Sequence, residues 1–238
     1  MTKVLAVTLA RGGSKKIKNK NIILLNNKPL IYYTIKEAKK SKLIDDYIIS
    51  TDSNKISKIC KKYNVSVPFK RPKSLSKDKS KSVDALIHAL KFMEQLKGFK
   101  YDYIIELMCT NPLKNSTDID NIITTMIKKK YESMIAVNRL FDQHPARIKK
   151  IIGNKLVDFN FREPLEKGRQ DLKPHAFIRS GSIYGMSRNF LLNKFRYKSK
   201  TSVPYILNPK RVINIDEPKD LLVAKAILNE KKKIKEVY

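Results

Sequence analysis

A short apolar run, followed at once by two glycines and a cluster of cations, constrains this chain more than any other feature. Residues 4–10 read Val-Leu-Ala-Val-Thr-Leu-Ala, which is typical of a strand buried on both faces of a sheet. Gly12 and Gly13 follow, and five Lys and Arg side chains lie within positions 11–20. Paired glycines let backbone N–H groups approach an anion, and open α/β sheets bind nucleotides in such loops. The run predicts an anion-binding loop; the alternative is a solvated basic loop.

Strand-like and helix-like segments alternate through most of the chain. We expect strands at residues 4–10, 46–51, 65–69, 101–108, 133–138, 177–186 and 212–215. Helices are expected at residues 29–40, 53–63, 82–96, from 117, at 188–195 and at 218–231. This alternation predicts an α/β fold with three layers, in which helices cover both faces of a mainly parallel sheet.

Residues 140–173 break the alternation, and we expect them to form an excursion from the core of a single domain spanning residues 1–238. Within the chain we find no internal repeat and no low-complexity linker. No apolar run approaches the ~18 residues that cross a bilayer, and the start does not resemble a signal peptide. We therefore expect a cytoplasmic protein without a membrane partner. Cys60 and Cys109 lie too far apart for a zinc motif, so we expect two buried thiols.

The charge of the chain is strongly positive, at +29 with 51 Lys and Arg residues, of which only ten are arginine. Such a charge raises the alternative of a basic nucleic-acid-binding protein. Base recognition favours arginine, and single-strand binding favours aromatic platforms beside it. The chain has no tryptophan, and its tyrosines do not alternate with arginine. We interpret most of the charge as solvated surface, so a nucleic-acid partner is not expected.

The first loop resembles the amino-terminal signature of the acylneuraminate cytidylyltransferases, the CMP-sialic acid synthetase family. That signature, A-R-x-x-S-K-G-x-x-x-K-N, is matched by Ala10-Arg11, Ser14-Lys15 and Lys20-Asn21. The sequence departs from it at position 16, where lysine replaces glycine. The spacing matches neither of the two better-known phosphate loops, G-x-x-x-x-G-K-[ST] and G-x-G-x-x-G.

Two further motifs follow in the family's order. Arg71-Pro72, Leu75, Asp78 and Ser82 resemble the segment R-P-x-x-L-x-x-D that folds over the cytidine; a surface arginine before proline is the alternative for Arg71. Residues 107–114 resemble L-Q-P-T-S-P-L-R, with Met108 in place of the glutamine that meets the sugar. A thioether cannot replace the hydrogen bonds of an amide. The sugar is therefore expected to differ from N-acetylneuraminate.

The last two motifs concern the sugar and a metal. Arg169-Gln170, Phe177, Gly181 and Ile183-Tyr184 resemble R-Q-x-L-P-x-x-F/Y-x-x-N-G-x-I-Y, in which an arginine would grip the sugar carboxylate. We favour Arg169 for this role, with Arg179 next. Residues 213–221 resemble I-D-I-D-x-x-x-D-L, where two aspartates hold magnesium. Asp216 is retained, but Asn214 replaces the first carboxylate; the alternative for Asp216 is simply the start of a helix.

The resemblance implies a Rossmann-like nucleotidyltransferase fold and the transfer of CMP from CTP to a nine-carbon α-keto acid sugar, releasing pyrophosphate. It implies catalytic roles for Arg11, Lys20 and Asp216. The nucleotide would be bound by Gly12, Ser14, Lys15, Asn21, Arg71 and Ser82. The sugar would be bound by Met108, Arg169, Gln170 and Arg179. Mg²⁺ would be held by Asp216 and Asn214.

It also implies that residues 140–187 form an extension that contributes to sugar binding and to a homodimer. The nearest alternative is a sugar nucleotidyltransferase for an eight-carbon keto-deoxy acid. A relative that binds nucleotide without catalysis, and the nucleic-acid-binding protein above, also remain open.

Overall fold

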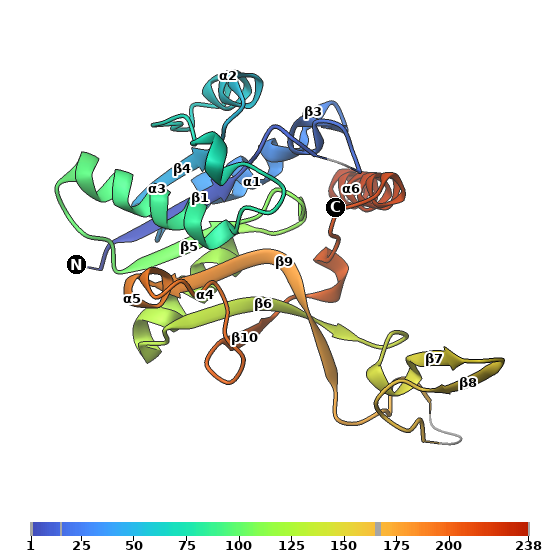
Figure 1. Cartoon of the computed structure of the whole chain (residues 1–238). Coiled ribbons are helices and arrows are strands. Elements are labelled where there is room, and N and C mark those ends of the chain that lie inside the picture. The colour runs from blue at the N-terminus through green and yellow to red at the C-terminus, as the bar shows by residue number, and fades with distance from the viewer. Residues whose placement is uncertain (1, 15, 165–167, 238) are drawn as a thin grey trace.

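A six-stranded sheet runs through the molecule in the order β10-β6-β9-β5-β1-β4 (Figure 1). The computed structural model describes residues 2–14, 16–164 and 168–237, with side chains through residue 230. The strands of the sheet are β1 (Val4–Leu9), β4 (Asp46–Ser50), β5 (Tyr103–Leu107), β6 (Ser133–Leu140), β9 (Ala176–Ser187) and β10 (Val203–Ile206). β9 is antiparallel to β5 and β6, whereas the other neighbouring strands pair in parallel. The expected α/β fold with a mainly parallel sheet is confirmed.

Helices cover both faces of the sheet. They are α1 (Leu30–Lys40), α2 (Asn54–Lys62), α3 (Ser82–Lys97), α4 (Ser116–Lys129), α5 (Arg188–Leu192) and α6 (Pro218–Val237). Successive side chains of a strand point to opposite faces. Accordingly, Leu5 and Val7 of β1 cluster with α3 and α5, whereas Val4 and Ala6 cluster with α1 and α4. α6 packs through Ala224 against the segment that precedes α1.

Short elements complete the fold. β2 (Leu24–Leu25) and β3 (Lys28–Pro29) form one hairpin, and β7 (Lys149–Ile152) and β8 (Lys155–Asp158) form another. Single turns of 3₁₀ helix are η1 (Lys20–Ile22), η2 (Lys73–Leu75), η3 (Pro145–Arg147) and η4 (Pro209–Arg211). Among the described helices, none is both long and apolar enough to cross a membrane.

Both cysteines are free thiols inside the core, as the sequence predicts. Cys60 and Cys109 belong to the same apolar cluster, between α1 and α2. Burial raises the pKa of each thiol to about 12, so both stay protonated near neutral pH. They act as small apolar side chains.

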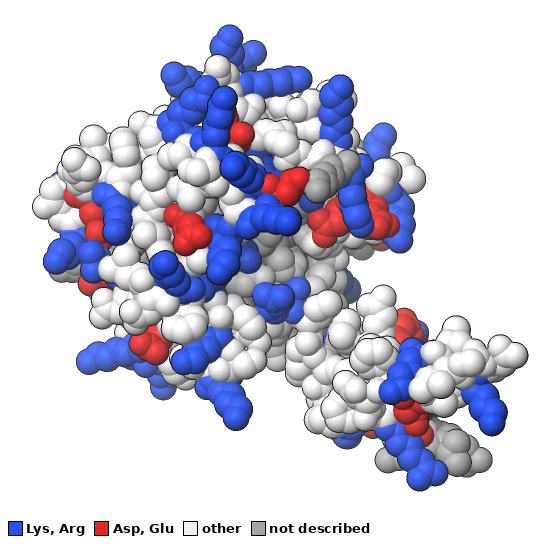
Figure 2. Space-filling model, in the orientation of Figure 1, with Lys and Arg blue, Asp and Glu red and all other residues white. Residues whose placement is uncertain are grey.

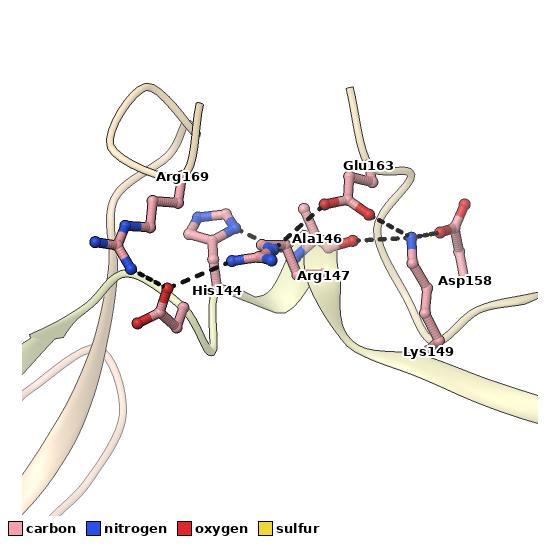
Figure 3. A network of polar contacts seen from close by, with 8 residues as sticks. His144, Ala146, Arg147, Lys149, Asp158, Glu163 and Arg169 are labelled. Carbon is pink, nitrogen blue, oxygen red and sulfur yellow. Dashed lines mark hydrogen bonds and ion pairs between the residues drawn. The ribbon is translucent and has the colours of Figure 1, made fainter. Parts of the chain in front are cut away.

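Residues 141–175 leave the sheet after β6 and return at β9, forming a projection that we call the arm. Figure 1 shows the arm, with its β7–β8 hairpin, standing away from the sheet, and Figure 2 shows it joined to the body through a narrow neck. Ion pairs connect its described residues: Asp142 pairs with Arg147 and Arg169, and Lys149 pairs with Asp158 and Glu163 (Figure 3). As expected, the chain makes an excursion from the sheet after β6, and the described part of that excursion contains a hairpin.

Two expected strands are wrong. Residues 65–69 form only an isolated bridge from Ser66 to Ile48, and a second bridge joins the following Lys70 to Thr51, because Pro68 lacks an N–H group for a continuous ladder. Residues 212–215 are not a strand either. Their apolar and polar residues alternate because Ile213 and Ile215 pack against the core cluster near α6. The N–H of Ile215 donates to the carbonyl oxygen of Thr110, at 2.8 Å.

Candidate active site

A cleft of about 330 Å³ opens where β1 and β5 end. Parallel strands deliver their following loops to one edge of the sheet, so segments distant in sequence meet there. Figure 2 shows Lys and Arg side chains, with a few carboxylates, gathered near the middle of this face of the molecule. The following predicted residues line the cleft: Arg11, Ser14, Lys20, Asn21, Arg71, Ser82 and Met108.

A hydrogen bond to Asp52 anchors the glycine-containing loop after β1. The N–H of Gly12 donates to Oδ1 of Asp52 at 2.9 Å. A Cβ atom on Gly12 would lie only 2.9 Å from Cβ of Ser53, so this position requires glycine. Asp52 does not cap α2, because Ser53 does so by accepting from the N–H of Ile56. Asp52 instead anchors the loop.

Arg11 reaches across the mouth of the cleft. Its Nη1 donates to Oδ1 of Asp78 at 2.7 Å, which joins the first loop to the segment before α3. The side chain of Asn21 turns back and donates to the carbonyl oxygen of Arg11 at 3.0 Å. Asn21 therefore shapes the loop as well as lining the cleft.

Lys20 joins the basic loop to the acidic turn before α6. Its Nζ lies 2.8 Å from Oδ1 of Asp216, although the two residues are almost two hundred positions apart in the sequence. Lys16 makes a parallel contact with Oε1 of Glu217 at 3.0 Å. That contact raises the pKa of Lys16 and lowers the pKa of Glu217. The cationic loop and the acidic turn thus converge on one place.

Arg71 is the most buried cation of the cleft, with 5% of its surface exposed. Its Nη2 donates to the carbonyl oxygen of Ser50 at 3.1 Å, but its buried Nε has no partner among the described atoms. Burial lowers the pKa of the guanidinium, and the nearby charge of Arg11 adds to this effect while Asp52 opposes it. A buried donor without a partner is costly unless a ligand supplies an acceptor.

The floor of the cleft is formed by the end of β5. Glu106, only 2% exposed, pairs with Nε of Arg196, and Nη2 of Arg196 lies 3.1 Å from the sulfur of Met108. Behind this floor, the ammonium of Lys114 is fully buried. It donates to the carbonyl oxygens of Met108 and Asn111, at 2.6 and 2.5 Å, and to Oγ1 of Thr34 at 2.9 Å. Burial lowers the pKa of Lys114 to about 7.

The predicted metal ligands lie beside Lys20. Nδ2 of Asn214 donates to Oδ2 of Asp216, and Oδ1 of Asn214 faces the backbone of Gly181. Among the described residues, no group of three His, Cys, Asp or Glu side chains could hold a metal ion. Mg²⁺ in nucleotide enzymes is commonly held by one or two carboxylates together with phosphate oxygens. Asp216 fits such a site as its single carboxylate, with the neutral oxygen of Asn214 available after rotation of the amide.

Four further predicted residues lie away from the lining of the cleft or outside the described residues. Arg169 and Gln170 are exposed on the arm, where Nη1 of Arg169 pairs with Asp142 at 2.5 Å. Within a single chain, Arg169 and Gln170 therefore lie apart from the sugar-binding candidates Met108 and Arg179. Arg179 of β9 lies beside the cleft, with its guanidinium 5.1 Å from the ring centroid of Tyr197. Lys15 lies outside the described residues.

Several functional candidates escape the sequence motifs. Asp52, Glu106 and Arg196 contact predicted residues or line the cleft. Glu106 carried a usable signal, because a carboxylate inside an apolar strand must have a charged partner. Nothing in the sequence indicates that Arg196 is this partner.

A mainly parallel sheet whose first strand delivers a basic, glycine-containing loop into a cleft defines a nucleotide-binding α/β protein. Residues 5–206 match the sequence model of the family described as Cytidylyltransferase. The chain belongs to this cytidylyltransferase family, and it is a nucleotidyltransferase.

Known proteins resemble the chain over nearly its whole length. It is 30% identical to the post-translational flagellin modification protein B of Campylobacter coli, over 97% of each chain. It is also 30% identical to a pseudaminic acid cytidylyltransferase of Campylobacter jejuni, over 94% of this chain and 96% of that one. A solved structure of CMP:2-keto-3-deoxy-manno-octonic acid synthetase complexed with CTP superposes with a TM-score of 0.70 at 15% identity, over 97% of this chain and 100% of that one. The last likeness establishes the Rossmann-like nucleotidyltransferase fold.

Proposed function

We propose that the chain transfers CMP from CTP to the anomeric hydroxyl of a nonulosonic acid, with pseudaminic acid as the first candidate. The hydroxyl oxygen attacks the α-phosphorus of CTP, the bond from that phosphorus to the pyrophosphate oxygen breaks, and the hydroxyl proton is released. The observation that carries the proposal is the meeting of Lys20 with Asp216 at the cleft that Arg11 and Arg71 also line. Relatives named as a pseudaminic acid cytidylyltransferase, 30% identical, and a CMP-N,N'-diacetyllegionaminic acid synthase, 27% identical, support the substrate class. They do not favour a nucleic-acid-binding protein.

The residues of the cleft would act mainly by positioning and by neutralising charge, because phosphoryl transfer needs little covalent help. Arg11 and Lys20 would stabilise the departing pyrophosphate. The backbone of Gly12, the hydroxyl of Ser14 and the ammonium of Lys15 would cradle the phosphates. Asn21, Arg71 and Ser82 would make the remaining contacts with the nucleotide. The unpartnered Nε of Arg71 supports its role, because a nucleotide oxygen would satisfy it.

Asp216, with Asn214 beside it, would hold Mg²⁺. When bound, this ion would neutralise part of the charge of the triphosphate. Without nucleotide, Nζ of Lys20 pairs with Oδ1 of Asp216 at 2.8 Å. For Asp216 to bind Mg²⁺, the ammonium of Lys20 would turn from this oxygen toward the phosphates of the bound nucleotide.

We further propose that the protein is a homodimer in which the arm covers a second copy. The arm exposes large apolar side chains, including Ile151, Leu156 and Phe161, whose exposed fractions are 76%, 70% and 56%. Soluble monomers rarely expose a large contiguous apolar patch. In a dimer, Arg169 and Gln170 would reach the partner's cleft, which would reconcile their place on the arm with a role in sugar binding.

Pyrophosphate release tests the reaction. The assay would contain CTP, Mg²⁺ and one acid sugar at a time: pseudaminic, legionaminic or neuraminic acid, or an eight-carbon keto-deoxy acid. We expect release that needs both CTP and a nine-carbon sugar, with pseudaminic acid fastest. Faster release with the eight-carbon acid would favour the alternative substrate, and absence of release with every sugar would refute the proposed function.

A further inference from the structure

Arg196 occupies an unusual position between the nucleotide cleft and a second, smaller cavity. It lies in the loop after α5, where its Nε pairs with the buried Glu106. Its guanidinium carbon lies over the ring of Tyr184, 3.8 Å from the ring centroid, in a cation–π contact. An ion pair on one edge and a ring on one face together fix the orientation of this guanidinium.

The opposite end of the guanidinium lacks a strong acceptor. Nη2 lies 3.1 Å from the sulfur of Met108, and a thioether is a weak acceptor. Nη1 contacts no acceptor among the residues that the structure describes. Both terminal nitrogens therefore hold donors that a ligand could use, and they form the parallel pair that a carboxylate matches.

The cavity beside Arg196 is cationic. It measures about 240 Å³, and its lining includes Lys81, Ser82, Arg179, Lys194, Arg196 and Tyr197. Lys81 and Ser82 also line the nucleotide cleft, so the two cavities adjoin. The described lining of the smaller cavity contains no carboxylate, and Glu106 offsets only one of its four cations. An anionic group next to the nucleotide is the occupant that this charge favours.

We propose that Arg196 binds the carboxylate of the acid sugar, in the same subunit that binds the triphosphate. This inference rests on the proposed function, since the carboxylate is that of the acceptor sugar. Arg179, whose guanidinium lies over the ring of Tyr197, also lines the cavity and offers a second cation. Met108 contributes by being a poor acceptor, because a glutamine there would accept a hydrogen bond from Nη2 and reduce its availability to the sugar.

Calorimetric titration of pseudaminic acid and of its methyl ester into the protein, saturated with a non-hydrolysable CTP analogue and Mg²⁺, tests this assignment. We expect the wild type to bind the acid at least about 10-fold more tightly than the ester, because a bidentate charged pair is lost in the ester. In Arg196→Lys, a cation remains for Glu106 but the fork is gone. We expect the acid-to-ester ratio to fall below about 3, with affinity for the CTP analogue within twofold of wild type.

Lys198→Gln is the matched control, because Lys198 lies in the same loop but does not line the cavity, and its ammonium lies over the ring of Phe195. It should keep the wild-type ratio. If Arg196→Lys melts at a clearly lower temperature, the double variant Glu106→Gln/Arg196→Gln replaces the ion pair by a neutral amide pair and should lose the discrimination in the same way.

The proposal is overturned by a wild type that does not distinguish acid from ester, by an unchanged ratio in Arg196→Lys, or by equal losses of sugar and nucleotide affinity. Failure of the proposed function looks different. In that case the wild type releases no pyrophosphate with any sugar of the panel, whereas an error about Arg196 alone leaves wild-type release intact.

Discussion

The buried ammonium of Lys114 gives the protein a specific dependence of stability on pH. Its pKa is lowered by burial to about 7, whereas an unfolded chain would have a pKa of about 10.4 for lysine. Above pH 7 the folded state gives up this proton and the unfolded state keeps it. Because the unfolded state then binds more protons, the free energy of unfolding rises with pH in this window, by up to about 1.4 kcal/mol per pH unit.

Lys114→Met removes this contribution while filling the same space. Between pH 7 and 9 the wild type should gain about 2 kcal/mol relative to the variant, since half of the lysine is already neutral at pH 7. Urea unfolding of both proteins at pH 7, 8 and 9 gives the difference directly. Lys36→Met, an exposed lysine on the neighbouring helix α1, is the control and should show no such trend.

A constant difference across this range would refute the reasoning. It would mean that the three oxygens around Nζ hold the proton in the folded state and offset the cost of burial. At pH 7 the variant should also weaken sugar binding, because Lys114 fixes the carbonyl of Met108 at the floor of the cleft.

Three further changes test the site and the arm. Lys20→Ala should reduce kcat by about 10²–10³ without lowering the melting temperature, measured by pyrophosphate release, whereas the exposed Lys18→Ala should stay near wild type; near-normal turnover in Lys20→Ala would contradict its role. Gly12→Ala should weaken CTP binding about 10-fold in a calorimetric titration, because its Cβ would meet Ser53; unchanged affinity would show that the loop adapts. Leu156→Glu should make the protein monomeric in sedimentation velocity, because it places a charge in the exposed apolar surface of the arm. If the wild type itself sediments as a monomer, the proposed homodimer is wrong.

Much of the fold follows from local pattern. The first strand, the helix at residues 82–97 and the parallel arrangement were predictable, because apolar periodicity and burial agree there. β10 was missed because it contains Pro204, which a strand tolerates only at the edge of a sheet. The strand expected at residues 212–215 was wrong because alternating burial also arises in a loop packed between elements.

The candidate site was predictable where the residues are close in sequence. The loop from Arg11 to Asn21 forms one wall of the cleft, as its composition indicates. The contact between Lys20 and Asp216 could be expected only from the family resemblance, because no local pattern links them. A carboxylate in the apolar strand around Glu106 indicates that a charged partner is needed, but nothing local identifies Arg196, which lies 90 positions away in an irregular loop.

The reversed direction of β9 has a consequence for how such proteins diversify. Because β9 runs against its neighbours, the chain departs at the end of β6 and re-enters at the start of β9 along one rim of the sheet. The two ends of the arm therefore lie side by side, at Leu140 of β6 and Ala176 of β9. The number of residues in the arm can change without altering how β6 and β9 pair in the sheet. Under the proposal that the arm takes part in sugar binding, exchanging residues 141–175 for the corresponding segment of a relative should transfer acceptor preference and leave nucleotide binding unchanged.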